Sequence, residues 1–250
     1  MTGPRLVLSN IGLLLSVLAG LTAVASGLGW RLNLWHFRFG LKVLGSAAYV
    51  AAGGAALSLI ALLWPPLGGR GMPLFVALIG LVIGVVVAGY PAYLRHLYRS
   101  LPVIHDIATD TDDPPAFVAV TPLRAGAENA TSYEGARIAA LQHRAYPNVK
   151  PAHYDSPPAK IFDVALAAAK DMSWEIVATV PGEGRIEATD TTFLYHFKDD
   201  VVVRVAADGT GTRIDVRSLS RVGRSDFGVN AERIEKYLAA LHERMEAAGK

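Results

Sequence analysis

Three long apolar runs without a charged residue dominate the first hundred residues of this chain. They cover residues 6–28, 43–64 and 73–94. A helix that crosses the hydrocarbon core of a bilayer needs about 20 apolar residues at a rise of 1.5 Å per residue. Aromatic side chains lie near the ends of the runs, where amphipathic rings favour the membrane interface: Trp30, Trp35, Trp64, Tyr90, Tyr93 and Tyr98. We therefore predict that residues 1–100 are a membrane region with three transmembrane helices and that the chain is an integral partner of a lipid bilayer.

The first run has a second interpretation. Arg5, the apolar run and the small residues Ala23–Ala25 resemble a signal peptide with its cleavage site. The run is long for such a segment and is preceded by a single basic residue, so we favour an uncleaved helix.

Small residues recur at four-residue spacing in two of the runs. They are Gly12, Ser16 and Gly20 in the first run and Gly80, Gly84 and Ala88 in the third. Such ridges let helix backbones approach closely, either to pack the three helices on one another or to form a homo-oligomer. No ionisable residue lies inside a run, which argues against a transporter or a proton relay.

Charge is divided unevenly between the two parts of the chain. Residues 1–100 contain no Asp or Glu, and their basic residues are Arg5, Arg31, Arg38, Lys42, Arg70, Arg95 and Arg99. The remaining residues hold the other 17 Lys and Arg (24 − 7) and all 22 acids, a net charge of −5. We therefore expect no nucleic-acid binding, because the polar part has no basic excess. The absence of cysteine excludes disulfides, thiolate metal sites and cysteine nucleophiles.

Two features of the sequence give conflicting indications of the orientation of the chain in the membrane. With three spans, residues 29–42 and the polar part share one side, which has five basic residues near the spans against Arg5 and Arg70 opposite. The positive-inside rule therefore favours a cytoplasmic polar part. The segment 29–42 alternates basic and aromatic residues, however, and an interfacial segment lying flat on the membrane would weaken that count.

The polar part predicts an α+β fold of two layers, an antiparallel sheet packed with helices. We expect residues 101–155 to form an irregular, Pro-rich polar strap that is interrupted by a short helix at 132–144. Residues 156–250 predict a helix from 156 to 172 capped by Ser156, strands at 174–180, from 185, at 201–207 and at 212–222, and a final helix capped by Asn230. This order of helix, three or four strands and helix is typical of a sheet with helices against one face.

One hairpin in this region has a predictable register. If residues 208–211 form the turn, one face carries the apolar pairs Val203 with Val216 and Val205 with Ile214. The other face then places Arg204 opposite Asp215. A slip of one residue would bury arginines in place of these apolar side chains, so the register is strongly determined.

The stretch "IHDIATDTDDPPAF" at 104–117 is the first candidate for chemistry. An EF-hand loop that starts at Asp110 would need Gly and an acid where Pro115 and Thr121 stand, so that interpretation fails. His105 with Asp106 is locally suggestive of a hydrolase, but Asp before Pro is more typical of Asx turns. We expect a structural strap, with His105, Asp106 and Asp110 as the candidates for ligand contact.

The stretch "SRVGRSDFGVN" at 220–230 is the second candidate. Its "DFG" lacks the other kinase motifs. Arginines and hydroxyls here precede a helix whose amino end favours anions, which predicts an anion-binding surface: Arg217, Ser220, Arg221, Arg224, Ser225, Asp226 and Asn230. The alternative is a solvated strand face whose arginines pair with Asp190, Asp215 and Asp226. No histidine spacing predicts a metal site, and we expect no cofactor.

These motifs resemble the domain of unknown function 1499 family. The resemblance rests on the two stretches above together with "PPAKIFDVALAAAKDMSWEIV", "GRIEATDTTF" and "FKDDVVVRV", which occur in order from residue 102 to about 242. The stretches typical of the family contain Asp106, Thr109, Asp110, Thr111 and Pro115 at the start and Arg217, Ser220, Arg221, Ser225, Asp226 and Asn230 near the end. The resemblance implies bacterial and plastid proteins without an assigned activity, so no catalytic residue is carried over. Relatives without the three spans often have export signals, which favours a multi-pass protein of the bacterial inner membrane with a periplasmic polar part.

Three functions stay open from the sequence. We favour a membrane-anchored, non-catalytic binding or scaffold module of the bacterial envelope, whose partner is an anionic small molecule, a lipid head group or an envelope protein. The alternative is a membrane-bound hydrolase-like enzyme that uses His105, Asp106 and Asp110 together with residues 217–226. In the third interpretation, Asp106 and Asp110 pair with Arg217 or Arg221 and tie the strap to the sheet.

Overall fold

The computed structural model describes residues 3–64 and 71–248. They divide into two compact units, which we call the membrane unit (residues 1–97 with 193–196) and the α+β unit (residues 98–192 with 197–250). The described part of the membrane unit contains α1 (Pro4–Arg31), α2 (Phe37–Leu63) and all of α3 (Gly71–Ser100) except its last three residues, which belong to the α+β unit. All three are long and apolar enough to span a bilayer, which confirms the prediction of three helices. Residues 37–42 belong to α2, so the interfacial segment considered between the first two spans is reduced to the turn at 32–36.

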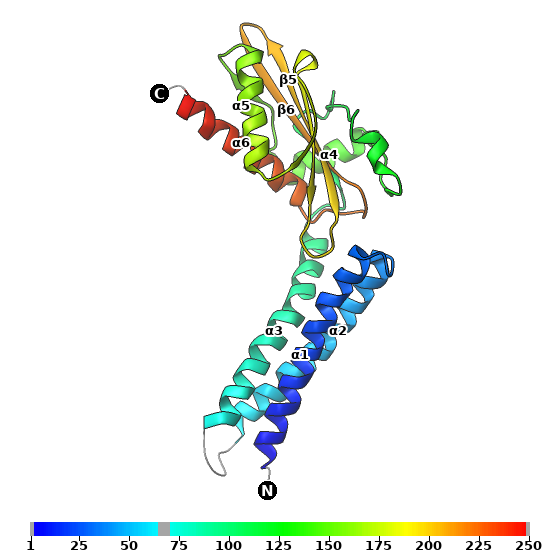
Figure 1. The fold of residues 1–250 in the computed structure, drawn as a ribbon, viewed down its shortest axis with the longest axis vertical. Coiled ribbons are helices and arrows are strands. Elements are labelled where there is room, and N and C mark those ends of the chain that lie inside the picture. Colours follow the sequence, from blue (N-terminus) through cyan, green and yellow to red (C-terminus); the bar gives the residue numbers. More distant parts are fainter. Residues whose placement is uncertain (1–2, 65–70, 249–250) are drawn as a thin grey trace. The chain divides into compact units, whose positions relative to one another are not determined.

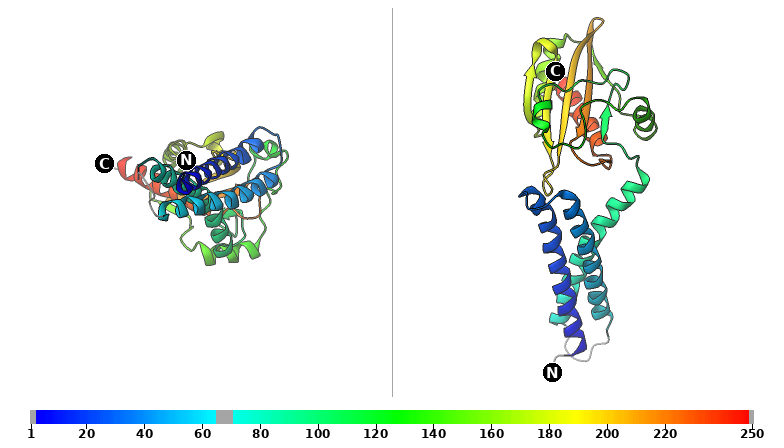
Figure 2. Two further views of the ribbon diagram at one scale, coloured as in Figure 1. Left: turned by 90° about the horizontal axis from the view of Figure 1, so that it is seen from below. Right: turned by 90° about the vertical axis from the view of Figure 1, so that its right-hand side faces the viewer.

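Interlocking glycine and serine residues hold the three helices of the membrane unit together. A methyl group on Gly54 of α2 would lie 2.6 Å from Ser16 Oγ and 2.9 Å from the Gly12 carbonyl oxygen, both on α1. A methyl group on Gly84 of α3 would lie 2.7 Å from the same Ser16 Oγ. The small-residue ridges therefore pack the spans on one another, with α1 and α2 side by side and α3 crossing them (Figure 2). At the start of α1, the Arg5 side chain donates to the Ala61 carbonyl oxygen near the end of α2, at 3.0 Å.

The α+β unit is built on an antiparallel sheet. Its described residues form six strands in the order β1-β6-β5-β4-β3, with β2 also paired to β6. The strands are β1 (Asp106–Ala108), β2 (Ala152–Tyr154), β3 (Glu175–Val180), β4 (Arg185–Thr191), β5 (Lys198–Asp208) and β6 (Gly211–Ser220). The β5–β6 register is the predicted one, with Val203 opposite Val216 and Arg204 opposite Asp215. Asp208 pairs with Gly211, so the turn is two residues long and not four.

Helices cover one face of this sheet. They are α4 (Ala136–Ala145), α5 (Pro158–Asp171) and α6 (Val229–Ala248), and α5 and α6 lie side by side on the sheet (Figure 1). Their buried side chains and those of the inward strand positions form one apolar core around Ile161, Tyr237 and Val203. The helices and the antiparallel sheet confirm the predicted α+β class.

Three local predictions were wrong. The strap expected to be irregular supplies β1 and β2, because both of these short strands complete their hydrogen bonds on β6. The helix expected from Ser156 begins at Pro158, with Pro157 at the cap position, and the Ser156 carbonyl instead accepts a 2.6 Å bond from the Thr212 hydroxyl. Asn230 does not cap the final helix. It lies inside α6, and the Asp226 carboxylate accepts the backbone N–H groups of Gly228 and Asn230 instead.

A second, smaller apolar cluster lies on the opposite face of the sheet. There Phe117 and Val120 of the strap pack on Val202 and Leu219. The segment 109–131, which includes the short 3-10 helix η1 (Thr121–Arg124), therefore covers part of a face that the strand pattern marks as polar.

Candidate functional site

The charged side chains of β4, β5 and β6 share the face of the sheet opposite α5 and α6. The strand pairing aligns them in rows: Arg185 with Arg204 and Asp215, Glu187 with Val202 and Arg217, and Thr189 with Asp200 and Leu219. Asp106 of β1 pairs with Leu219 and extends the same face. Alternation along each strand thus concentrates acids and arginines on one surface. This charged face and the segment 109–131 over it are the candidate site.

Asp106 and Arg217 form a bidentate ion pair in the interior of the unit. Arg217 Nε and Nη2 donate to the two carboxylate oxygens of Asp106 at 2.9 and 2.7 Å, and the two side chains are 3% and 2% exposed. The same guanidinium donates to the carbonyls of Pro115 at 3.2 Å and Thr131 at 2.8 Å. It also lies over the ring of Phe117, 4.9 Å from the centroid. Arg217 therefore binds both β1 and the segment after it, and its donors are directed at protein oxygens.

Asp200 is the centre of a second buried cluster. It accepts two bonds from Arg221, at 2.9 and 2.7 Å, one from the Thr189 hydroxyl at 2.8 Å, and one from Arg124. Arg221 also donates to the Leu123 carbonyl at 2.9 Å. Because Arg124 and Leu123 lie in η1, this carboxylate joins the sheet to the strap.

Glu187 holds the strap through its backbone. Its carboxylate accepts the N–H groups of Val118, Ala119 and Val120 at distances of 2.9 to 3.2 Å, and it also pairs with Arg185. Three consecutive N–H groups that converge on one anion form the kind of nest that binds phosphate in other proteins. Here the protein supplies the anion itself, from a side chain that is completely buried.

Asp110 closes the network at the edge of the strap. Its carboxylate accepts the N–H groups of Asp112 and Asp113, as in an Asx turn, and a 2.6 Å bond from Arg213. Burial alone would raise the pKa of Asp110, but these N–H groups together with Arg213 and Arg204 lower it below its usual value. The carboxylate is therefore stabilised in its ionised form.

A separate polar cluster lies beneath the start of α6. The Asn230 side chain accepts from the Ser218 hydroxyl at 2.7 Å and donates to Ser220 Oγ and to the His105 carbonyl, both at 3.0 Å. Arg233, one turn later, donates to Asp199 at 2.6 Å and to Asp190 at 2.9 Å. Burial lowers the pKa of Arg233, but the two carboxylates outweigh this effect and raise it. The cluster ties α6 to β4, β5 and β6 and to His105, the residue before β1.

Residues 106–241 match the family described as "Protein of unknown function (DUF1499)". The match covers 136 of the 250 residues, from Asp106 to Leu241. The chain belongs to the DUF1499 family. No curated protein matches the chain. Among solved structures, the chain is similar to TTHA0849 from Thermus thermophilus, with 17% identity over 40% of this chain and 97% of that one and a TM-score of 0.28.

The DUF1499 motifs identified in the sequence meet in space. Asp106 pairs with Arg217, and Asp110 pairs with Arg213 and Arg204 in place of Arg217 or Arg221. Among the arginines of the second motif, Arg224 is exposed, whereas Arg221 is mostly enclosed by its bonds to Asp200. Ser225 accepts the N–H of Phe227 at 3.3 Å, and Asp226 caps α6. His105 is near the surface, with Nε2 3.4 Å from Glu134.

Five buried charges among the described residues of the DUF1499 domain escaped the sequence reasoning: Arg124, Glu187, Asp199, Asp200 and Arg233. Glu187 lies between the apolar residues Ile186 and Ala188, which is the usual pattern of a solvated strand position, and Asp200 follows another acid. Nothing in their own strands therefore marked them as buried. Arg233 follows Asn230 by three residues and precedes Ile234, a spacing that places it toward the core. This spacing was the one feature of the sequence from which the burial of Arg233 could have been predicted.

The geometry limits what the charged face can do chemically. A general base needs a carboxylate oxygen within reach of a substrate proton. Both oxygens of Asp106 accept from Arg217, and both oxygens of Glu187 accept from the strap backbone. Among the described residues, no group of three or more His, Asp or Glu side chains is arranged to hold a metal ion. The charged side chains thus spend their hydrogen bonds on holding the strap against the sheet.

Proposed function

We propose that the chain is a membrane-anchored, non-catalytic binding or scaffold module of the bacterial envelope. The observation that carries this proposal is the mutual pairing of the family's charged motifs inside the α+β unit. Separating the members of a buried ion pair leaves an uncompensated charge in the interior, so these pairs disfavour arrangements of the chain that break them. The motifs of the DUF1499 domain therefore serve to present a fixed surface to a partner.

The part of the second motif that reaches solvent is the proposed contact surface. Arg224 is exposed and Ser225 is half-buried, and both precede the amino end of α6. The charge at this point favours an anionic partner, whether a small molecule, a lipid head group or an acidic region of another envelope protein. Arg217 and Arg221 support this surface from below by holding the strap in place.

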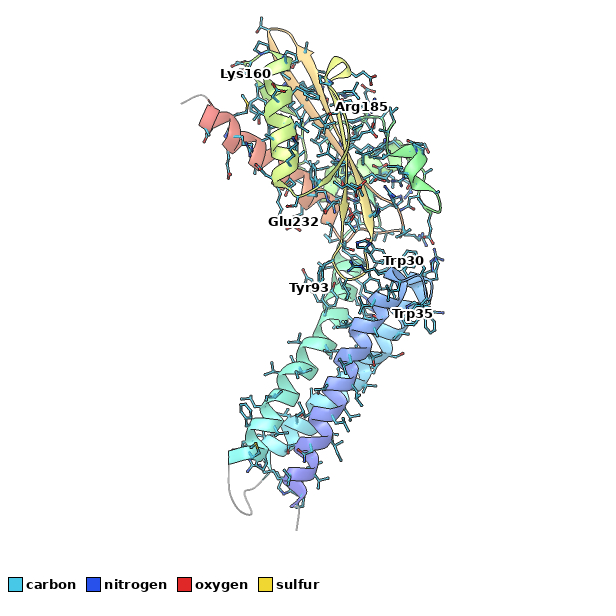
Figure 3. All side chains as sticks on the ribbon, in the orientation of Figure 1. Trp30, Trp35, Tyr93, Lys160, Arg185 and Glu232 are labelled. Carbon is cyan, nitrogen blue, oxygen red and sulfur yellow. The ribbon has the colours of Figure 1, made fainter. Side chains whose placement is uncertain are left out.

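A charge reversal tests this surface in the full chain. Arg224→Glu should abolish in-cell cross-linking to the partner, with the unfolding transition unchanged because the side chain is exposed. The matched control is Lys160→Glu at the start of α5, far from the beginning of α6 near Glu232 (Figure 3). If both variants keep the same cross-linked species and ligands as the wild type, Arg224 is not part of a binding surface.

For the location, we propose the bacterial inner membrane with the α+β unit in the periplasm. The exported relatives of the family support this side. The basic residues near the ends of the spans support the cytoplasmic alternative, the more so because Arg5 on the opposite side is engaged with the Ala61 carbonyl of α2. Alkaline phosphatase fused after Lys250 should be active and a fluorescent protein at the same place dark. The reverse result places the unit in the cytoplasm.

A hydrolase-like enzyme is the second candidate, and one contact favours it. The segment with His105 and Asp106 and the segment 217–226 lie side by side, as such a site would require. The His105 side chain is 15% exposed and lies 3.4 Å from Glu134. Turnover of chromogenic esters or phosphates by the wild type that is lost in His105→Ala, with folding intact, would replace the scaffold proposal by this one.

A further inference from the structure

Four residues from the β4–β5 connection belong to the membrane unit. They are Phe193–His196, which we call the FLYH tip. The Tyr195 hydroxyl lies 2.8 Å from Ser26 Oγ of α1, and a methyl group on Gly27 would lie 2.7 Å from Leu194 Cγ. The tip is thus packed directly against α1.

The turn between α1 and α2 contacts α1 at the same level. Trp35 Nε1 donates to the Ser26 carbonyl at 3.1 Å, and the Trp35 ring leaves no space for a side chain at Gly29. Ser26 therefore accepts contacts from both the FLYH tip and the 32–36 turn. These two segments, far apart in sequence, form one surface at one end of the membrane unit.

The position of Arg31 sets the depth of this surface in the bilayer. Arg31 ends α1, and a guanidinium is placed at the headgroup level because burial in the hydrocarbon is costly. Ser26 and Gly27 precede Arg31 by five and four residues, which is about 6 to 8 Å along the helix axis at 1.5 Å per residue. That distance places the FLYH tip at the boundary between headgroups and acyl chains.

The side chains of the surface suit this boundary. Phe193 is 89% exposed, and Leu32, Leu34 and Phe39 of the neighbouring turn and helix are also exposed. Trp30, Trp35 and Tyr93 lie near the same end of the helices (Figure 3). Interleaved with these apolar groups are the exposed cations Arg31, Arg38 and Lys42. Apolar groups at the acyl boundary with cations above them are typical of surfaces that bind anionic lipid.

We propose that the FLYH tip is a membrane anchor in which Phe193 inserts into the bilayer interface, and that it forms, with the α1–α2 turn, a binding surface for anionic phospholipid headgroups. Tyr195 and Leu194 attach the tip to α1, Phe193 enters the acyl boundary, and the three cations contact the phosphates. This inference concerns the membrane unit and is independent of the function proposed for Arg224.

The absence of cysteine in the chain permits a direct test of insertion. Phe193→Cys and, as a control, Thr210→Cys are labelled with an environment-sensitive fluorophore in the full chain, in nanodiscs of equimolar phosphatidylcholine and phosphatidylglycerol. Thr210 is also exposed at a hairpin turn, at the opposite end of β5. Lipids brominated near the headgroup end of the acyl chain should quench the label at 193 several-fold more than the label at 210. Equal quenching of the two labels overturns the insertion.

Lipid selectivity tests the cations. Phospholipid retained by the full chain after detergent extraction should be enriched in phosphatidylglycerol over the nanodisc composition. Changing the three cations of the surface to Gln should lower this enrichment, by about fivefold for each cation that contacts a phosphate. Changing Arg137, Lys160 and Lys236 of the α+β unit to Gln should leave it unaltered. Equal enrichment in both triple variants overturns the headgroup surface.

Discussion

Removing the carboxylate of Asp106 should destabilise the α+β unit severely. The Arg217 side chain is 3% exposed in the structure, and in Asp106→Ala it would lose two bonds of 2.9 and 2.7 Å and keep the Pro115 and Thr131 carbonyls as partners. Breaking a buried ion pair by removing one member costs about 3–5 kcal/mol, because the other charge is left uncompensated. Small domains have about 5–15 kcal/mol of stability in total, so this loss is a large fraction of it.

The measurement is the urea midpoint of the α+β unit in the full chain in detergent, read by pulse proteolysis. The control is Asp113→Ala, which removes a carboxylate 83% exposed and paired with Arg204. An exposed pair contributes about 0–1 kcal/mol, so this variant should unfold close to the wild type. The double variant Asp106→Leu with Arg217→Met removes both charges and should recover part of the loss.

Two results would refute the reasoning. One is an Asp106→Ala variant no less stable than Asp113→Ala, which would mean that Arg217 is not buried in solution. The other is a double variant that is less stable than Asp106→Ala by the full cost of a second independent substitution. That outcome would show that the two side chains do not compensate each other.

Three further predictions follow from the same structure. Glu187→Ala should destabilise the α+β unit by about 3 kcal/mol and accelerate hydrogen exchange at residues 118–120, because their N–H groups lose a buried acceptor, whereas Glu183→Ala at the surface should change neither. Burial raises the pKa of Asp226 against the N–H groups it accepts, so its ionisation opposes folding above the unfolded value near 3.8. Asp226→Asn keeps a capping oxygen, so its free energy of unfolding should rise relative to that of the wild type as pH rises from about 3 to 7. Asp226→Ala should cost about 1 kcal/mol in helix capping. The same stability difference between Asp226→Asn and the wild type at both pH values would contradict the burial of the carboxylate. In the membrane unit, Gly54→Ala should lower the melting temperature in detergent, because the methyl group would lie 2.6 Å from Ser16 Oγ, whereas Gly53→Ala meets no atom within 4 Å and should leave the melting temperature unchanged or raise it; equal melting temperatures for the two variants would refute the packing.

The strength of local patterns explains which parts of the fold were predictable. A run of more than 20 uncharged residues has few alternatives to a transmembrane helix, and α1, α2 and α3 each contain one. The β5–β6 register was equally constrained, because a slip would have buried arginines in place of Val203 and Val216. By contrast, β1 and β2 have three residues each and acquire strand structure only by pairing with β6. Segments this short carry almost no periodicity of their own.

The candidate site shows the same limit. The sequence singled out Asp106, Asp110 and the arginines near residue 217, and their motifs do meet. It did not reveal Glu187 or Asp200. A charged residue on the polar face of a strand is predicted to be exposed, and the strand pattern is the same when another segment covers that face. Asn230 was mistaken for a helix cap because Asp226 and Asn230 have similar cap preferences, and only the chain path shows which one precedes the first turn.

The sequence by itself determined the membrane region, the α+β class of the rest and which residues share each face of the β5–β6 hairpin, because periods of 2 and 3.6 residues and long apolar runs are local properties. Only the tertiary structure decided that the charged face of the sheet is buried. That decision depends on contacts such as Arg217 with Asp106 and Glu187 with the Val118 backbone, which join residues 111 and 69 positions apart. Burial of a charge is a property of what covers it, and the covering segment comes from a distant part of the chain.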